Sequence, residues 1–183
     1  MARLPFLDKS ALRPEDQDLL ARDINLYRVL VHSPGAARNF GRLGGFIRSK
    51  SRLDPRLREM AILQVGYLTR SAYEYSHHVK IGQEFGVQPG DIRAIAEETA
   101  GRATALEPLA RAVLSAAREM TTELTVSNET FAALQAGLDN ECLLDLVMTI
   151  SFYNGVVRLL GALQIEVEAE YQHYLEEFPL PKD

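Results

Sequence analysis

The sequence predicts a single all-α domain, because helix signals recur along the chain and strand signals are nearly absent. No alternating run of Val, Ile or Thr is bounded by hairpin turn residues. Several segments instead begin with a capping residue followed by proline, a pattern typical of helix starts. A chain of 183 residues has the size of one domain, and it contains no fixed-period repeat or low-complexity linker. We therefore expect one helical bundle over 1–183.

The N-terminal part is expected to hold two short helices over about 14–32 and then two longer ones. Ser33 followed by proline predicts a helix that runs towards Arg48. Asp54 followed by proline repeats the signal, and the stretch 56–68 behind it is apolar almost all round. A helix of that kind belongs in the centre of a bundle.

The next three helices are delimited by glycine and proline. A helix over 71–85 should end there, because Gly86 suits the left-handed position after a helix. A second helix, 89–99, starts at a proline and stops before a glycine. A third, amphipathic helix starts at Pro108 and runs through Met120.

The C-terminal part should contain one short and one long helix. Ser127 heads the short one and Asp139 caps the long one, which covers about 141–162. The tail to Phe178 is expected to continue as helix.

Composition excludes several classes of function. Apolar residues make up 46% and charged residues 25% of the chain, as in ordinary soluble proteins. The net charge of −5 argues against a nucleic-acid binder, which needs a basic surface. Cys142 is the only cysteine, so no intrachain disulfide or Cys-x-x-Cys motif is possible. With no signal-peptide pattern at the N-terminus, we expect a cytoplasmic protein.

The stretch 143–163 is long and apolar enough to suggest a membrane span. Asp145, Asn154 and Arg158 interrupt it, and charges are costly inside a bilayer. We therefore predict a buried helix and no membrane association.

The segment around Glu74 and His78 carries the clearest chemical signal. These residues are four apart, so both lie on one apolar face of the expected helix. His77 should point towards Lys80 and Glu84, on a solvated face. A carboxylate beside an imidazole on a partly buried face forms a plausible acid–base pair.

Glu59 lies on the expected central helix, among apolar neighbours. A buried carboxylate must find a partner or become protonated, so a salt bridge to Arg56 or Arg58 is the alternative to a catalytic role. Ser71-x-x-Glu74 is likewise open to a second interpretation, since this spacing also forms a capping box.

Further candidates are expected to bind the substrate. Asn154 and Arg158 are four apart on the last long helix, and the donor fork of Arg158 suits a carboxylate; an ion pair between Arg158 and Glu59 is the alternative. Tyr73 and Ser71 complete the predicted substrate-binding set. No metal site is expected, because the adjacent histidines diverge on a helix and no His-x-x-x-His or cysteine pair is present.

The spacing of these residues resembles the alkylhydroperoxidase D superfamily. Its thiol peroxidases carry Cys-x-x-Cys-x-x-x-His, with a glutamate twelve residues before the first cysteine. Here His78 matches the histidine, Ser71 and Glu74 stand at the two cysteine positions, and Glu59 matches the glutamate. The resemblance covers about 30–163 and implies that superfamily's helical bundle, assembled into dimers, trimers or hexamers.

The missing cysteines argue against peroxidase activity, because serine and glutamate cannot carry out thiol–disulfide chemistry. The Glu-x-x-x-His pair resembles the carboxymuconolactone decarboxylases instead. That resemblance implies a cofactor-independent lyase, or a related isomerase or hydrolase, acting on a small carboxylated lactone or enol. His78 would be the acid, oriented by Glu74 or Glu59. The alternative is a member of the same superfamily that binds a small molecule, or assembles, without turnover.

Overall fold

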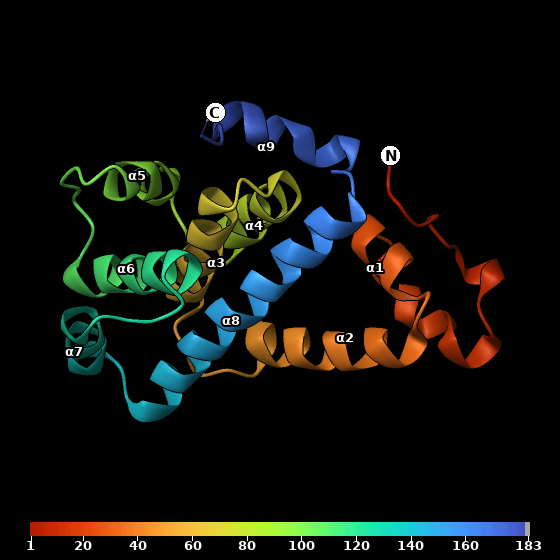
Figure 1. Ribbon diagram of the computed structural model, residues 1–183, viewed down its shortest axis with the longest axis horizontal. Helices are drawn as coiled ribbons and strands as arrows, with labels where there is room; N and C mark the ends of the chain where they lie inside the picture. The colour runs from red at the N-terminus through yellow and green to blue at the C-terminus, as the bar shows by residue number, and fades with distance from the viewer. Residues whose placement is uncertain (182–183) are drawn as a thin grey trace.

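The computed structural model describes residues 1–181, which form an all-helical bundle without strands (Figure 1). The helices, in chain order, are α1 Asn25–Leu30, α2 Pro34–Ser49, α3 Pro55–Leu68, α4 Ala72–Glu84, α5 Pro89–Thr99, α6 Pro108–Thr122, α7 Asn128–Gly137, α8 Asn140–Leu163 and α9 Gln172–Glu177. Short 3-10 turns are η1 Lys9–Ala11, η2 Pro14–Leu20 and η3 Ala169–Tyr171. The predicted all-α class is confirmed.

Helix α3 forms the centre of the bundle. The Asp54 side chain accepts a hydrogen bond from the amide of Leu57 at 3.0 Å, so the predicted cap starts the helix. Every residue from 57 to 66 is buried, and α3 packs against α4, α5, α6 and α8. The all-round apolar pattern therefore correctly predicted a central helix.

Helix α8 crosses the bundle as its longest element (Figure 1). Asp139 caps its start by accepting from the amide of Cys142 at 2.8 Å. Among the described helices, α8 alone is long and apolar enough to cross a membrane, and 44% of its most apolar window is buried in the structure. The expectation of a buried helix holds for its inner face, whereas Leu144 and Met148 are 60% and 40% exposed.

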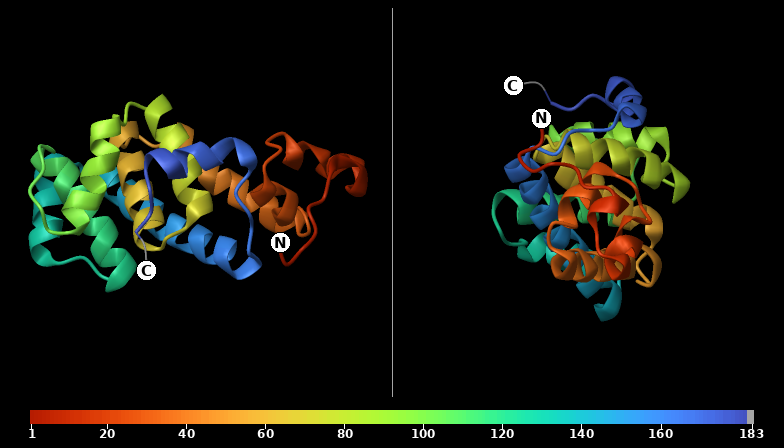
Figure 2. Two further views of the ribbon diagram at one scale, coloured as in Figure 1. Left: turned by 90° about the horizontal axis from the view of Figure 1, so that it is seen from above. Right: turned by 90° about the vertical axis from the view of Figure 1, so that its right-hand side faces the viewer.

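The chain after α8 corrects the prediction of a continuous helical tail. Gln164 adopts a left-handed backbone conformation with φ of +52°, which ends α8. The following segment runs through a loop and η3 into α9, which contacts α4 and lies over it in Figures 1 and 2. We name residues 164–178 the C-terminal strap.

Gly66 allows α3 and α4 to approach each other closely. A Cβ atom at this position would lie 3.2 Å from the backbone nitrogen of Tyr75. We expect Gly66→Ala to lower the free energy of unfolding by about 1–3 kcal/mol through overpacking, measured by urea denaturation. Gly155→Ala is the control, because nothing lies within 4 Å of its added Cβ and alanine favours a helix interior; equal stability of both variants would contradict the prediction.

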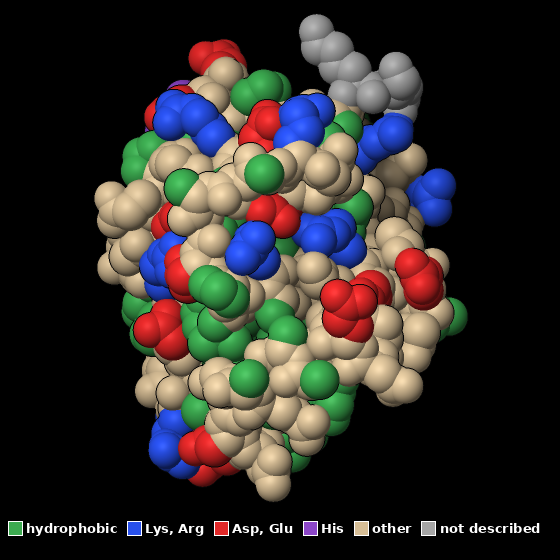
Figure 3. Space-filling model, turned by 90° about the vertical axis from the view of Figure 1, so that its left-hand side faces the viewer, with side chains coloured by type: hydrophobic (Ala, Val, Ile, Leu, Met, Phe, Trp, Pro, Cys, Tyr) green, Lys and Arg blue, Asp and Glu red, His purple; other side chains and the backbone are tan. Residues whose placement is uncertain are grey.

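The face formed by the α5, α6 and α7 end of the molecule is mixed in charge. Figure 3 shows Lys and Arg side chains interspersed with Asp and Glu side chains across this face, with hydrophobic side chains between them. A mixed surface of this type creates no extended field of one sign, so this end of the bundle shows no basic stripe of the sort that nucleic-acid binders use.

Candidate functional site

The contact between α3 and α4 brings Glu59, Glu74 and His78 together. Nδ1 of His78 lies 2.6 Å from Oε2 of Glu59, and Nε2 of His78 lies 2.9 Å from Oε1 of Glu74. All three side chains are buried. Arg58 extends the row, because its Nε donates to Oε1 of Glu59 at 2.9 Å. We name Arg58, Glu59, His78 and Glu74 the relay.

Electrostatics favour the charged forms of His78 and Glu59. Burial by itself lowers the pKa of His78, but the charges of Glu59 and Glu74 and hydrogen bonds to both raise it to about 9. Burial opposes ionisation of Glu59, yet His78 and Arg58 hold the pKa of that carboxyl below its usual value. At neutral pH the relay therefore holds an imidazolium between carboxylates, and its formal charges cancel.

The relay forms part of the wall of a cavity of about 210 Å³. Glu74 and His78 line it, whereas Glu59 lies behind His78 and does not. The ion pair with His78 uses only Oε1 of Glu74; Oε2 has no hydrogen bond or ion pair within 1–181. Glu74 is therefore the relay carboxylate that a bound molecule can contact.

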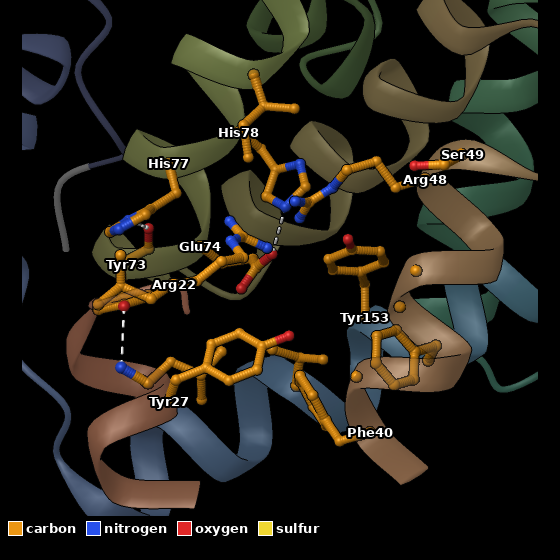
Figure 4. A pocket seen from close by; sticks show the side chains of 18 residues that line it. Arg22, Tyr27, Phe40, Arg48, Ser49, Tyr73, Glu74, His77, His78 and Tyr153 are labelled. Carbon is orange, nitrogen blue, oxygen red and sulfur yellow. Dashed lines mark hydrogen bonds and ion pairs between the residues drawn. The ribbon is translucent and has the colours of Figure 1, made fainter. Parts of the chain in front are cut away.

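Residues that the sequence analysis missed form the opposite wall. Tyr153 of α8 meets the edge of the His78 ring, with centroids 4.9 Å apart, and the side chain of Arg48 reaches from α2 towards both (Figure 4). Burial raises the pKa of Tyr153, and the charges of Glu74 and Glu59 add to the effect, so its hydroxyl stays protonated. Neither Arg48 nor Tyr153 belongs to a spacing pattern that would single it out.

The capping-box interpretation of Ser71 and Glu74 is wrong. Ser71 is the N-cap of α4, but its side chain makes no capping hydrogen bond, and Glu74 pairs with His78. Ser71 also lines a different depression, beside the strap, so its predicted place near a bound substrate is not supported. Tyr73 does line the cavity, and its hydroxyl donates to Glu168 of the strap at 3.1 Å.

Asn154 and Arg158, the residues expected to bind the substrate, do not line the cavity beside the relay. They line a separate surface depression with Met120, and Nη1 of Arg158 donates to Oδ1 of Asn154 at 2.9 Å. The proposed ion pair between Arg158 and Glu59 is likewise absent. The reason is helical phase, because Arg158 faces solvent while Tyr153 of the same helix faces the relay.

His77 corrects the expectation of a solvated side chain. Its ring is stacked between Tyr73 and Tyr171, with centroid distances of 4.1 and 3.7 Å, and it is only 4% exposed. Nδ1 lies 2.8 Å from the carbonyl oxygen of Tyr73 and Nε2 lies 3.1 Å from Oε2 of Glu168. The strap covers the helix face that would otherwise be solvated.

The structure shows which of the two candidate arginines forms a salt bridge with Glu59. Arg58, not Arg56, is its partner, because Arg56 binds Asp91 and Glu107. Within 1–181 no group of three or more His, Cys, Asp or Glu side chains is arranged to hold a metal ion.

Several solved structures have the same helical architecture as this chain. An uncharacterized peroxidase-related protein from Ralstonia eutropha, described as an alkylhydroperoxidase AhpD core, matches with a TM-score of 0.79 and 20% identity over 99% of this chain and 98% of its own. A cysteine-to-alanine variant of the debrominase Bmp8, in complex with 2,3,4-tribromopyrrole, matches with a TM-score of 0.80 and 18% identity over 97% of both chains. A protein of unknown function from Agrobacterium tumefaciens gives 0.68 and 17% over 77% of this chain and 96% of its own.

The fold is therefore that of the alkylhydroperoxidase D-like helical bundles. Residues 34–119 match the model of the Carboxymuconolactone decarboxylase family. Part of the chain therefore resembles the carboxymuconolactone decarboxylase family, and the fold that carries it is alkylhydroperoxidase D-like. No curated protein matches the chain significantly in sequence.

Proposed function

We propose that the protein is a cofactor-independent lyase, of the decarboxylase type, acting on a small carboxylated lactone or enol by acid–base catalysis. A related isomerase or hydrolase reaction would use the same groups. The observation that carries the proposal is the position of His78, held between Glu59 and Glu74 at the wall of a small cavity, where the two carboxylates raise its pKa. Groups with shifted pKa values in a cavity are typical of catalytic sites.

The relay supplies the proton that a decarboxylation needs. The bond to the departing carboxylate breaks, and its electron pair moves into the conjugated carbonyl, which gives carbon dioxide and an enolate. The proton held between Nε2 of His78 and Oε1 of Glu74 then forms the new C–H bond. Glu59 stays ionised because Arg58 pairs with it, and solvent returns the proton to His78.

The size of the cavity limits the substrate. A volume of about 210 Å³ is below the roughly 300–1,000 Å³ of sites for drug-sized ligands. A protein of similar fold binds a ligand with a small ring, since the structure of the debrominase Bmp8 variant is a complex with 2,3,4-tribromopyrrole.

A substrate screen tests the proposal. Wild type and Glu74→Gln are incubated with carboxylated lactones, enol-lactones and β-keto acids, and product mass and ultraviolet absorbance are followed. We expect turnover of a lactone acid that falls about 100-fold or more in Glu74→Gln, the usual contribution of general acid–base catalysis. Glu84→Gln is the matched control, because Glu84 is an exposed residue of α4 that pairs with Lys80. Turnover that survives unchanged in Glu74→Gln would refute the role of the relay.

A non-catalytic binding or assembly protein is the second candidate. The observation that favours it is that both ring nitrogens of His78 already face carboxylates, as in a purely structural network. Under this alternative no panel member is converted by wild type, while the relay variants lose stability. A hydroperoxide with a dithiol completes the panel as the peroxidase control, and we expect no turnover of it because the two cysteines are absent.

A further inference from the structure

The cavity contains two arginines that no carboxylate of the described chain neutralises. Arg22 and Arg48 both line it, and neither forms an ion pair within 1–181. By contrast, the arginines of α3 are paired, since Arg58 binds Glu59 and Arg56 binds Asp91. Because the charges of the relay cancel, the two arginines leave the cavity with an excess of positive charge.

Arg48 has a donor that lacks a partner. Its Nε is buried and has no hydrogen-bond partner in the described chain, although a buried, unpaired donor of this kind is destabilising. The backbone fixes the residue, because the carbonyl oxygen of Arg48 accepts from Nη1 of Arg58 at 3.0 Å. Figure 4 shows its guanidinium beside the His78 ring and above Tyr153. An anion placed here would contact both the arginine and the relay.

Aromatic side chains form the adjoining wall. Phe40 lies 4.9 Å from Phe152 and 6.3 Å from Tyr27 between ring centroids, and Phe152 lies 5.4 Å from Tyr153. All four line the cavity. Such a wall favours a ligand with a flat, unsaturated ring. Arg22 lies at the rim, where its guanidinium carbon is 5.7 Å from the Tyr27 ring centroid.

We propose that Arg48 is the anchor for the carboxylate of a small planar acid, with Arg22 at the rim, and that the ring of this acid packs against the aromatic wall. This subsite rests on the proposed function for its role in turnover, but binding can be measured without turnover. Arg48, with its planar donor fork, then takes the place that the sequence analysis gave to Arg158. It orients the acid so that its reacting carbon faces Glu74 and His78.

Calorimetric titration of benzoate and furan carboxylate, each compared with its neutral carboxamide, tests the subsite. We expect wild type to bind the carboxylates at least about tenfold more tightly than the amides, the usual magnitude for a charged hydrogen bond. This preference should disappear in Arg48→Gln and be partly retained in Arg48→Lys, which keeps the charge and loses the fork. Arg42→Gln is the matched control, because Arg42 is an exposed residue of the same helix that lines a different depression.

Several outcomes would overturn the subsite. They are equal binding of acid and amide by wild type, no binding of either, or an unchanged preference in a folded Arg48→Gln protein. Circular dichroism and thermal unfolding verify that each variant is folded. Failure of the proposed reaction is distinguishable: acids that bind through Arg48 but are never converted refute the lyase and leave the subsite standing. Turnover with an unchanged KM in Arg48→Gln refutes the subsite alone.

Discussion

Replacing His78 with glutamine is expected to lower turnover of a lactone acid by about 100- to 10,000-fold and to destabilise the fold. The imidazolium is the cation between Glu59 and Glu74. Without it, two buried carboxylates lose their shared partner, and breaking a buried pair in this way costs about 3–5 kcal/mol. The carbonyl oxygen of glutamine adds a further acceptor and supplies no transferable proton. Activity assays and urea denaturation measure the two effects separately.

The free energy of unfolding of the wild-type protein should also depend on pH, because the pKa values of His78 and Glu59 are shifted in the folded state. The pKa of His78 is raised from 6.5 to about 9, so His78 stabilises the folded state fully below pH 6.5 and loses this contribution as the pH rises to about 9. The pKa of Glu59 is lowered from 4.5, so its contribution is present above that value and lost as the pH falls through the lower one. We expect the free energy of unfolding to decline on the alkaline side in wild type and to lose this decline in His78→Gln.

His173→Gln is the matched control for both measurements. His173 is exposed near the C-terminus, where its ring contacts Tyr174. It should leave turnover and the alkaline decline unchanged. A wild-type stability that is flat from pH 6.5 to about 9 would contradict the charged relay, and equal activities of the two histidine variants would contradict the catalytic role of His78.

Local signals in the sequence predicted most of the helices and the proximity of Glu74 and His78. Asp54 and Asp139 both cap helices as expected, because capping depends only on residues a few positions away. The four-residue spacing of Glu74 and His78 likewise fixes their proximity within one helix. Glu59 lies beside them because α3 packs on α4. The all-round apolar pattern of 56–68 predicted a central helix, but it did not predict the angle at which this helix packs on α4.

The remaining features of the site depend on packing between distant segments. His77 is covered by the C-terminal strap, and no periodicity within α4 reveals this cover. Arg48 reaches the relay because α2 lies beside it in the fold. Arg158 has a plausible residue type and position for anion binding, but the phase of α8 directs it away from the relay. Predicting a helix therefore did not predict which of its faces meets the cavity.

Arg58→Met should be the second most disruptive substitution, with an expected loss of about 3–5 kcal/mol in the free energy of unfolding. Arg58 is 2% exposed, its Nε donates to Glu59, and its guanidinium carbon lies 4.6 Å from the Phe85 ring centroid. Methionine retains much of the apolar packing but leaves Glu59 with His78 as its only cationic partner within 1–181. The pKa of Glu59 should therefore rise, and part of the activity should be lost with it. Urea denaturation and the pH profile of turnover measure both consequences.

A double substitution separates lost charge from lost packing. If the penalty arises from the uncompensated carboxylate, then Glu59→Gln should recover part of the stability of Arg58→Met, because a neutral amide no longer needs the guanidinium. Arg56→Met is the adjacent control: its partners Asp91 and Glu107 are nearer solvent, so its loss should be smaller. No recovery in the double variant would show that Arg58 acts through packing on Phe85 rather than through the charge of Glu59. Its place in the relay would then have to be abandoned, because a residue that only fills space cannot hold Glu59 ionised during proton transfer.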